Sequence, residues 1–138
     1  MNPVAIFWPM IVLAALTCFV SGLVPISRFR AGFAGKVGPK DFRAGESARV
    51  PEPVAIPNRN YMNLLEISVL FYVACLSFNA TRHVLPVDVS IALAFVALRI
   101  VHSSIHLTYN NVYHRGMVFG LSVTALLALW VRFAISLL

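Results

Sequence analysis

The chain has 138 residues, of which 59% are hydrophobic and only 12% charged. A soluble domain carries about 25% charged residues, so this composition excludes a water-soluble globular protein and indicates an integral membrane protein. The net charge of +6 does not indicate nucleic-acid binding. Six of the eleven basic residues fall between residues 28 and 49, and no aromatic–basic repeats surround them.

Four apolar stretches dominate the chain, each of about 20–25 residues and therefore long enough to cross the roughly 30 Å of hydrocarbon in a bilayer. The expected spans cover about residues 4–26, 58–82, 86–109 and 114–138. The remaining residues leave no room for a second domain. We therefore expect one transmembrane domain over residues 1–138.

The linker between the first two spans, about residues 27–57, contains four glycines and four prolines as well as the basic residues. That density of helix breakers predicts an extended loop, with a short helical turn around residues 39–45. The positive-inside rule places this loop in the cytoplasm and the N-terminus outside, as in a bacterial inner membrane. The first span lacks the basic start of a signal peptide, so we expect a permanent helix.

The ends of the later spans carry helix signals. Asn58 follows Pro57 and could cap the second helix, and Pro86 suits the first turn of the third. Only a few residues separate the second, third and fourth spans, and short links make antiparallel neighbours. The predicted fold is an all-α, four-helix transmembrane bundle.

Two polar stripes interrupt this apolar pattern. Arg59, Asn63 and Glu66 are spaced i, i+4, i+7 in the second span, so they share one helix face. Arg99, His102 and His106 form a similar stripe in the third span, which Tyr109 continues. Ionisable groups at membrane depth cost about 2.5–3.5 kcal/mol each, so they normally pair or face a wet cavity. The stripes therefore predict one shared polar site inside the bundle.

The residue types of these stripes leave three interpretations open. A zwitterionic ligand could place its carboxylate on Arg59 and Asn63 and its amine on Glu66. The stripes could instead form a structural network in which Glu66 pairs with Arg99. A metal held by His102, His106 and Glu66 is the third interpretation, but the nearby arginines would repel a cation, and we expect no metal.

Arg115 stands at the start of the fourth span. It could be an interfacial anchor that fixes the topology, or it could stabilise an anion such as a thiolate. A free thiol has a pKa of about 8.5, and a neighbouring cation lowers it. A bound thiol beside Arg115 would then be a nucleophile at neutral pH.

The ordered set of motifs resembles a known family. Arg59-x-x-x-Asn63-x-x-Glu66 followed by Phe71, then Arg99-x-x-His102 and Arg115, is similar to the signature of the MAPEG family (membrane-associated proteins in eicosanoid and glutathione metabolism). Within it, the chain most resembles microsomal glutathione transferase. The resemblance covers nearly the whole chain.

The resemblance implies a homotrimer that binds glutathione as co-substrate between subunits near the cytoplasmic face, while a lipophilic acceptor enters from the bilayer. Arg59 and Asn63 would hold the carboxylate and amide groups of glutathione, and Glu66 would hold its γ-glutamyl amine. The pocket would be lined by Arg99, His102, His106 and Tyr109. Arg115 would be the catalytic counter-charge of the thiolate.

The expected function is a glutathione-dependent transferase or peroxidase. Two positions depart from the family pattern, namely Val69 in place of a proline and His106 in place of a tyrosine. They support an alternative, a non-catalytic subunit of the same fold that packs in a larger membrane complex or binds lipid. A transporter is a third possibility, against which four short helices without an internal repeat argue.

Overall fold

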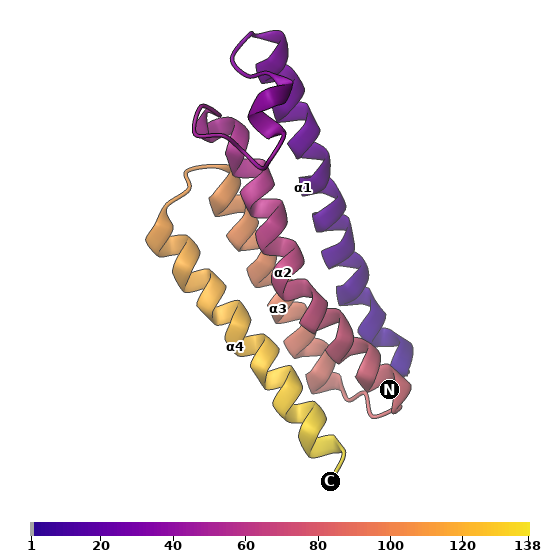
Figure 1. The fold of residues 1–138 in the computed structure, drawn as a ribbon. Helices are drawn as coiled ribbons and strands as arrows, with labels where there is room; N and C mark the ends of the chain where they lie inside the picture. Colours follow the sequence, from indigo (N-terminus) through magenta and orange to yellow (C-terminus); the bar gives the residue numbers. More distant parts are fainter. Residues whose placement is uncertain (1) are drawn as a thin grey trace.

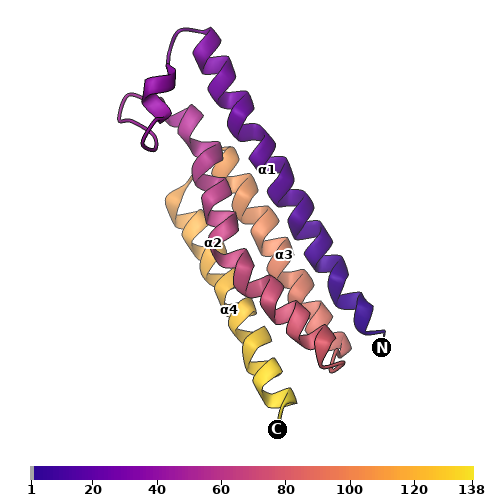
Figure 2. The same cartoon turned by 45° about the vertical axis from the view of Figure 1, so that its right-hand side comes forward.

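The computed structural model describes residues 2–138, in which four long helices run side by side (Figures 1 and 2). The helices are α1 (Phe7–Phe33), α2 (Glu52–Ala80), α3 (Pro86–Leu107) and α4 (Val112–Ser136), with short 3₁₀ helices η1 (Pro3–Ile6) and η2 (Pro39–Phe42). No β-strand occurs in this part of the chain. All four long helices are long and apolar enough to cross a membrane, which confirms the predicted all-α architecture with four spans.

The first two helices extend further than the sequence predicted. α1 continues to Phe33 instead of ending near residue 26, and α2 begins at Glu52 instead of residue 58. Asn58 therefore lies inside α2, and its prediction as an N-cap is wrong. Pro53 stands in the first turn, where its missing N–H has no helical partner to lose. Pro57, one turn later, can remove only one helical hydrogen bond, so neither proline prevents the early start.

These extensions shorten the linker to residues 34–51, and η2 forms within it where a helical turn was expected. The later helix starts lie close to the predicted ones. Pro86 occupies the first turn of α3. α4 begins at Val112, capped by Asn111, whose side-chain oxygen accepts hydrogen bonds from the backbone N–H groups of Tyr113 and His114 at 3.0 and 3.1 Å.

The bundle is held together by two closely packed helix pairs, α1 with α2 and α3 with α4. Aromatic rings join these pairs in the interior. Phe71 of α2 stacks on Phe95 of α3 with ring centroids 4.5 Å apart, and Phe78 of α2 meets Phe133 of α4 edge-on at 5.3 Å. Such pairs stabilise a core by about 0.5–1.5 kcal/mol beyond their buried area.

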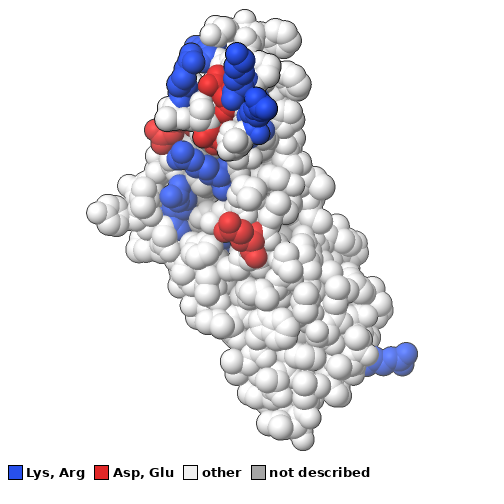
Figure 3. All heavy atoms as spheres, in the orientation of Figure 1, with Lys and Arg blue, Asp and Glu red and all other residues white. Residues whose placement is uncertain are grey.

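Charged side chains gather at one end of the molecule, above a largely uncharged body (Figure 3). This end, called the basic end below, consists of the C-terminal turns of α1 and α3, the linker 34–51, and the N-terminal turns of α2 and α4. The opposite end, called the far end, carries η1, the turn between α2 and α3, and the last residues of α4 (Figure 1). The two polar stripes lie in the half of the bundle that leads to the basic end.

Candidate functional site

The turn between α3 and α4 fixes the position of Arg115. Asn110 adopts a left-handed backbone with φ of 47°, which asparagine tolerates better than most residues. Its backbone N–H donates to the carbonyl of Ile105 at 2.8 Å and so closes the end of α3. In this position the Asn110 side-chain oxygen accepts a hydrogen bond from Nη1 of Arg115 at 2.7 Å. The guanidinium is therefore held at the junction of the two helices.

The stripe on α2 and the stripe on α3 meet through Arg99. Its side chain is fully buried, and Nη2 donates to both the backbone and the side-chain oxygen of Asn63, at 3.0 and 2.7 Å. Since the side-chain oxygen of Asn63 is occupied by Arg99, its amide N–H groups remain for another partner. About one turn nearer the basic end on the same helix pair, the hydroxyl of Ser103 donates to the side-chain oxygen of Asn60 at 3.2 Å.

An open cavity of about 370 Å³ lies above this contact at the basic end. Its polar lining consists of Glu52, Arg59, Asn63, His106, Asn110 and Arg115. A smaller cavity of about 210 Å³ adjoins it and adds His102 and Phe119. Asn63, Val112 and Arg115 line both, so the two form one continuous space between α2, α3 and α4.

Several buried polar atoms beside this space have no hydrogen-bond partner in residues 2–138. They are Nδ2 of Asn60, Nε and Nη1 of Arg99, and Nδ1 of both His102 and His106. An unsatisfied buried polar group costs about 1–3 kcal/mol, and more when it is charged. Their concentration around one cavity is typical of a site that takes a polar ligand or water.

The charges around the cavity favour an anion. Arg59 and Arg115 line it and Arg99 lies beneath it, against one carboxylate, that of Glu52. Glu52 is also partly engaged, because its Oε1 accepts a long hydrogen bond of 3.5 Å from Asn110. In residues 2–138 no group of three or more His, Cys, Asp and Glu side chains is placed to hold a metal ion.

The structure brings most of the predicted site residues together. Arg59, Asn63, His106 and Arg115 line the larger cavity, His102 lines the smaller one, and Arg99 supports Asn63 from below.

Two predicted residues lie elsewhere. Tyr109 is exposed and its hydroxyl contacts Nδ1 of His114 at 3.2 Å, so it does not line either cavity. Glu66 is exposed on the surface of the single subunit, and no side chain in residues 2–138 forms an ion pair with it. The Glu66–Arg99 pair, one of the interpretations that the sequence left open, is therefore absent within residues 2–138, because Arg99 donates to Asn63 instead.

Two cavity residues were not recognised as site residues from the sequence, Glu52 and Asn110. Glu52 was missed because the helix was expected to begin after Pro57. A start at Pro53, in the first-turn position that proline favours, would have placed Glu52 and Arg59 two turns apart on α2. Asn110 continued the α3 stripe in the sequence, but its left-handed turn could not be inferred from spacing.

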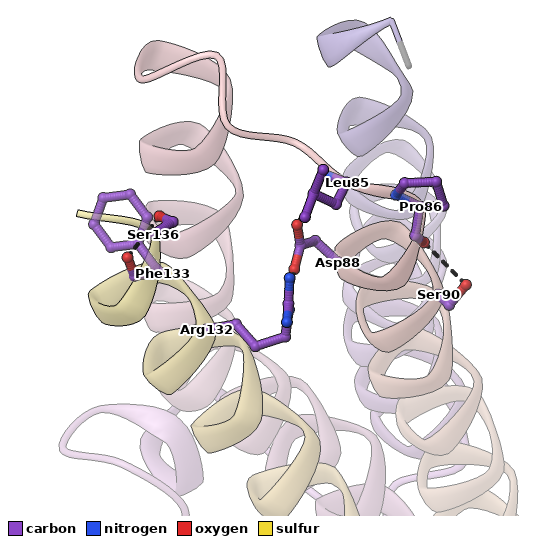
Figure 4. Close-up of polar contacts among 7 residues, drawn as sticks. All are labelled: Leu85, Pro86, Asp88, Ser90, Arg132, Phe133 and Ser136. Carbon is purple, nitrogen blue, oxygen red and sulfur yellow. Dashed lines mark hydrogen bonds and ion pairs between the residues drawn. The ribbon is translucent and has the colours of Figure 1, made fainter. Parts of the chain in front are cut away.

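The far end holds a second polar contact of a different kind (Figure 4). Asp88 is fully buried in the first turn of α3, and its carboxylate accepts from the backbone N–H of Leu85 at 2.9 Å and from Nε of Arg132 at 2.5 Å. Each carboxylate oxygen has a partner and none is left for a ligand, so we interpret this contact as a structural clamp between α3 and α4.

Comparison with known proteins gives one finding about the family. The sequence matches the model of the MAPEG family over residues 6–135, which is nearly the whole chain. No curated protein and no solved structure matches it. The helices, the cavity and this match lead to one conclusion: the chain belongs to the MAPEG family, whose membrane proteins are associated with glutathione and eicosanoid metabolism.

Proposed function

We propose that this protein is a membrane-bound, glutathione-dependent transferase or peroxidase. The observation that carries the proposal is the open cavity at the basic end, where Arg59, Asn63, His106 and Arg115 converge. Glutathione is an anionic peptide with a thiol, two carboxylates and one amine. A cavity with two arginines on its wall and a third beneath it suits such an anion.

Each residue takes a role that its position supports. Arg59 and the free amide N–H groups of Asn63 hold a carboxylate and a peptide carbonyl. Arg99 is a positioning residue, because it fixes the Asn63 side chain from below at 2.7 Å. His102 and His106 line the walls, and Nδ1 of each ring forms no hydrogen bond within residues 2–138.

Arg115 is the proposed catalytic residue. Asn110 holds its guanidinium at the mouth of both cavities, where a nearby thiol would lose its proton more readily. The thiolate sulfur then attacks an electrophilic carbon and displaces its leaving group. With a hydroperoxide, the sulfur attacks the terminal oxygen and gives an alcohol and a sulfenic acid, which a second glutathione converts to disulfide and water. The reaction is accelerated because the thiolate and the acceptor are held close together and because Arg115 stabilises the negative charge on sulfur.

We further propose that the protein is a homotrimer with its glutathione site at a subunit boundary. Glu66 lies at the middle of α2 and is exposed on the isolated subunit, together with Arg59. A carboxylate facing lipid at that depth is unfavourable by about 2.5–3.5 kcal/mol, so a neighbouring subunit has reason to cover it. The γ-glutamyl amine of glutathione would reach Glu66 in the groove that the neighbour closes, and Tyr109 would reach the same groove.

The orientation follows from the charge pattern. Six of the eleven basic residues lie between Arg28 and Arg49 at the basic end. By the positive-inside rule this end faces the cytoplasm and the N-terminus lies outside, in a bacterial inner membrane. The whole chain then forms one transmembrane domain, and lipophilic acceptors reach the site from the bilayer.

The proposal is tested by titrating the purified protein with glutathione and following near-ultraviolet thiolate absorbance. We expect a thiolate signal near neutral pH, lost in Arg115→Gln and much weaker in Arg59→Ala. Arg82→Gln, which neutralises an exposed arginine at the far end, is the matched control and should behave like wild type. S-methylglutathione should bind without a signal. No thiolate signal in the wild type would contradict the proposal.

A second candidate is a non-catalytic subunit that keeps this fold and packs in a larger membrane complex. The presence of His106 in the cavity wall, at a position where the family usually has tyrosine, favours it. Under this alternative the protein co-purifies with stoichiometric partners, and added glutathione leaves its melting temperature unchanged. A stand-alone oligomer stabilised by glutathione excludes it.

A further inference from the structure

Two adjoining cavities lie outside the candidate site, between the last turns of α1 and the 3₁₀ helix η2. The first, of about 400 Å³, has an apolar wall made by Phe29, Phe33 and Phe42. The second, also about 400 Å³, is lined by three basic residues, Lys36, Lys40 and Arg49, and by Asp41. Residues 37–39 form the ridge between them and line both. An apolar space and a basic space are therefore joined along one edge.

The apolar cavity lies where the membrane surface is expected. α1 has 27 residues and is about 40 Å long at 1.5 Å per residue, whereas the hydrocarbon is about 30 Å thick. Its last two turns therefore reach the headgroup level at the basic end. Yet Phe29 is 66% exposed and Phe33 92% exposed in these turns. Large apolar side chains that are exposed next to each other in this way mark a surface that contacts membrane lipid.

The carboxylates of this region leave an excess of positive charge in the basic cavity, which Asp41 lines together with the three basic residues. Glu46 pairs with Arg28 at 3.3 Å, and the guanidinium of Arg28 also covers the Phe42 ring at 4.6 Å. Asp41 accepts hydrogen bonds from the backbone N–H of Gly38 at 2.9 Å and from the Ser47 hydroxyl at 2.8 Å.

The three cationic side chains of the basic cavity remain available. Lys36, Lys40 and Arg49 form no ion pair in the described residues 2–138. Three positive charges against the single carboxylate of Asp41 leave a net positive charge that can meet an anion at the membrane surface.

We propose that these two cavities form a binding site for one anionic phospholipid, with its phosphate among Lys36, Lys40 and Arg49 and an acyl chain against Phe29, Phe33 and Phe42. The two halves of the site match the two halves of the ligand, and the ridge at residues 37–39 lies between headgroup and chain. Clusters of basic residues next to a membrane span attract anionic lipids by about 1 kcal/mol per charge. This site is separate from the cavity between α2, α3 and α4 and does not depend on the proposed enzymatic function.

Native mass spectrometry of the full-length protein in detergent tests the proposal, with phosphatidylglycerol and phosphatidylcholine added in parallel. We expect one retained phosphatidylglycerol per chain and much weaker retention of phosphatidylcholine. Neutralising each of the three basic residues should weaken phosphatidylglycerol binding about fivefold, and Lys36→Gln/Lys40→Gln/Arg49→Gln about a hundredfold. Arg82→Gln, at the far end, is the matched charge control and should bind like wild type.

A second variant tests the apolar half on its own. Phe33→Ser should weaken binding of phosphatidylglycerol but leave glycerol phosphate, which has the headgroup and no chain, unaffected. All four substituted side chains are exposed, and a wild-type melting temperature will show that the variants fold. Equal retention of the two lipids by the wild type, or equal loss in the triple variant and Arg82→Gln, would overturn the proposal.

Discussion

Two polar clusters are buried in this bundle, and they differ in how completely their hydrogen bonds are satisfied. At the far end, both oxygens of Asp88 have partners, Arg132 and the Leu85 N–H (Figure 4). Towards the basic end, Arg99 uses one of its three nitrogens on Asn63, and the other two have no partner in residues 2–138. The first cluster holds α3 and α4 together, whereas the second leaves polar atoms free for the ligand proposed above.

This difference matters because both clusters contain an arginine within an apolar helix, where an unpaired charge is costly. A satisfied pair contributes to stability and has no capacity left for a ligand. An incompletely satisfied cluster beside a cavity has that capacity and contributes less to stability. Substitutions at the two clusters should therefore affect different properties of the protein.

The largest effect on stability is expected for Asp88→Ala. It removes the partner of Arg132 and the acceptor of the Leu85 N–H at the start of α3. Breaking a buried ion pair lowers the free energy of unfolding by about 3–5 kcal/mol. The Arg132 side chain is 34% exposed, so water can partly solvate it after the substitution, and we expect a loss of about 3 kcal/mol. Thermal unfolding in detergent measures it. Glutathione binding per folded protein should not change, and a melting temperature equal to wild type would contradict the assignment as a clamp.

Arg99→Met should show the opposite behaviour. Replacing an incompletely paired buried arginine with an apolar side chain of similar length should change stability by no more than about 1 kcal/mol. Without Arg99, the Asn63 side chain loses the contact that orients it, so glutathione affinity should fall at least about tenfold, or 1.4 kcal/mol. Calorimetric titration measures the affinity. If Arg99→Met and Asp88→Ala lost the same stability and neither changed binding, the distinction between the clusters would be wrong.

A smaller effect on binding is expected from the two acidic residues of α2. Glu52 lines the cavity and repels a bound carboxylate, so Glu52→Gln should tighten glutathione binding by about two- to fivefold. Glu66→Gln should weaken it, because the proposed partner of Glu66 is the amine of the ligand. Measuring the glutathione affinity of both variants under the same conditions shows whether each substitution strengthens or weakens binding. Changes in the same direction would remove Glu66 from the proposed site.

The smallest effect concerns the linker. The hydrogen bond from the Gly38 N–H, and then that from the Ser47 hydroxyl, lower the pKa of Asp41. A carboxyl with a lowered pKa stabilises the fold above its unfolded pKa of about 3.9, and this contribution is lost as the pH falls through the lower folded value. Amide protection around η2 should therefore decrease in acid. In Asp41→Ala it should be roughly two- to tenfold lower at neutral pH and lose this acid dependence.

Hydrogen exchange read by mass spectrometry on the peptides that cover residues 34–51 gives the protection directly. The same peptides in Ser47→Ala, which removes only one of the two contacts, are the control and should show a smaller loss. Protection in Asp41→Ala that still falls in acid would show that another group is responsible.

The fold was largely predictable, because four apolar stretches of membrane length leave few alternatives. Helix ends were harder to predict where proline was involved. The sequence predicts a helix boundary at Pro57, yet this residue lies inside α2, since Pro53 already satisfies the first-turn preference. The pairing of Arg132 could be expected from its cost in lipid, but its partner could not be identified before α3 and α4 were placed side by side.

The site was predictable only in part. Helical spacing put Arg59 with Asn63 and His102 with His106, and the structure joins these pairs around one cavity. Spacing did not reveal that Arg99 would choose Asn63 over Glu66. Asn63 and Glu66 both lie at a depth along α2 that Arg99 could reach. Which of them becomes its partner depends on how α2 is rotated relative to α3. The packing of large side chains such as Phe71 and Phe95 sets that rotation.

The most direct test of the central claim is a structure of the protein in a lipid nanodisc with glutathione added. We expect density for the peptide in the cavity beside Arg59, Asn63 and Arg115, with its sulfur next to the Arg115 guanidinium. Side chains of another protein, or ordered water alone, in that cavity at saturating glutathione would contradict the claim that these polar groups are a thiol-binding site.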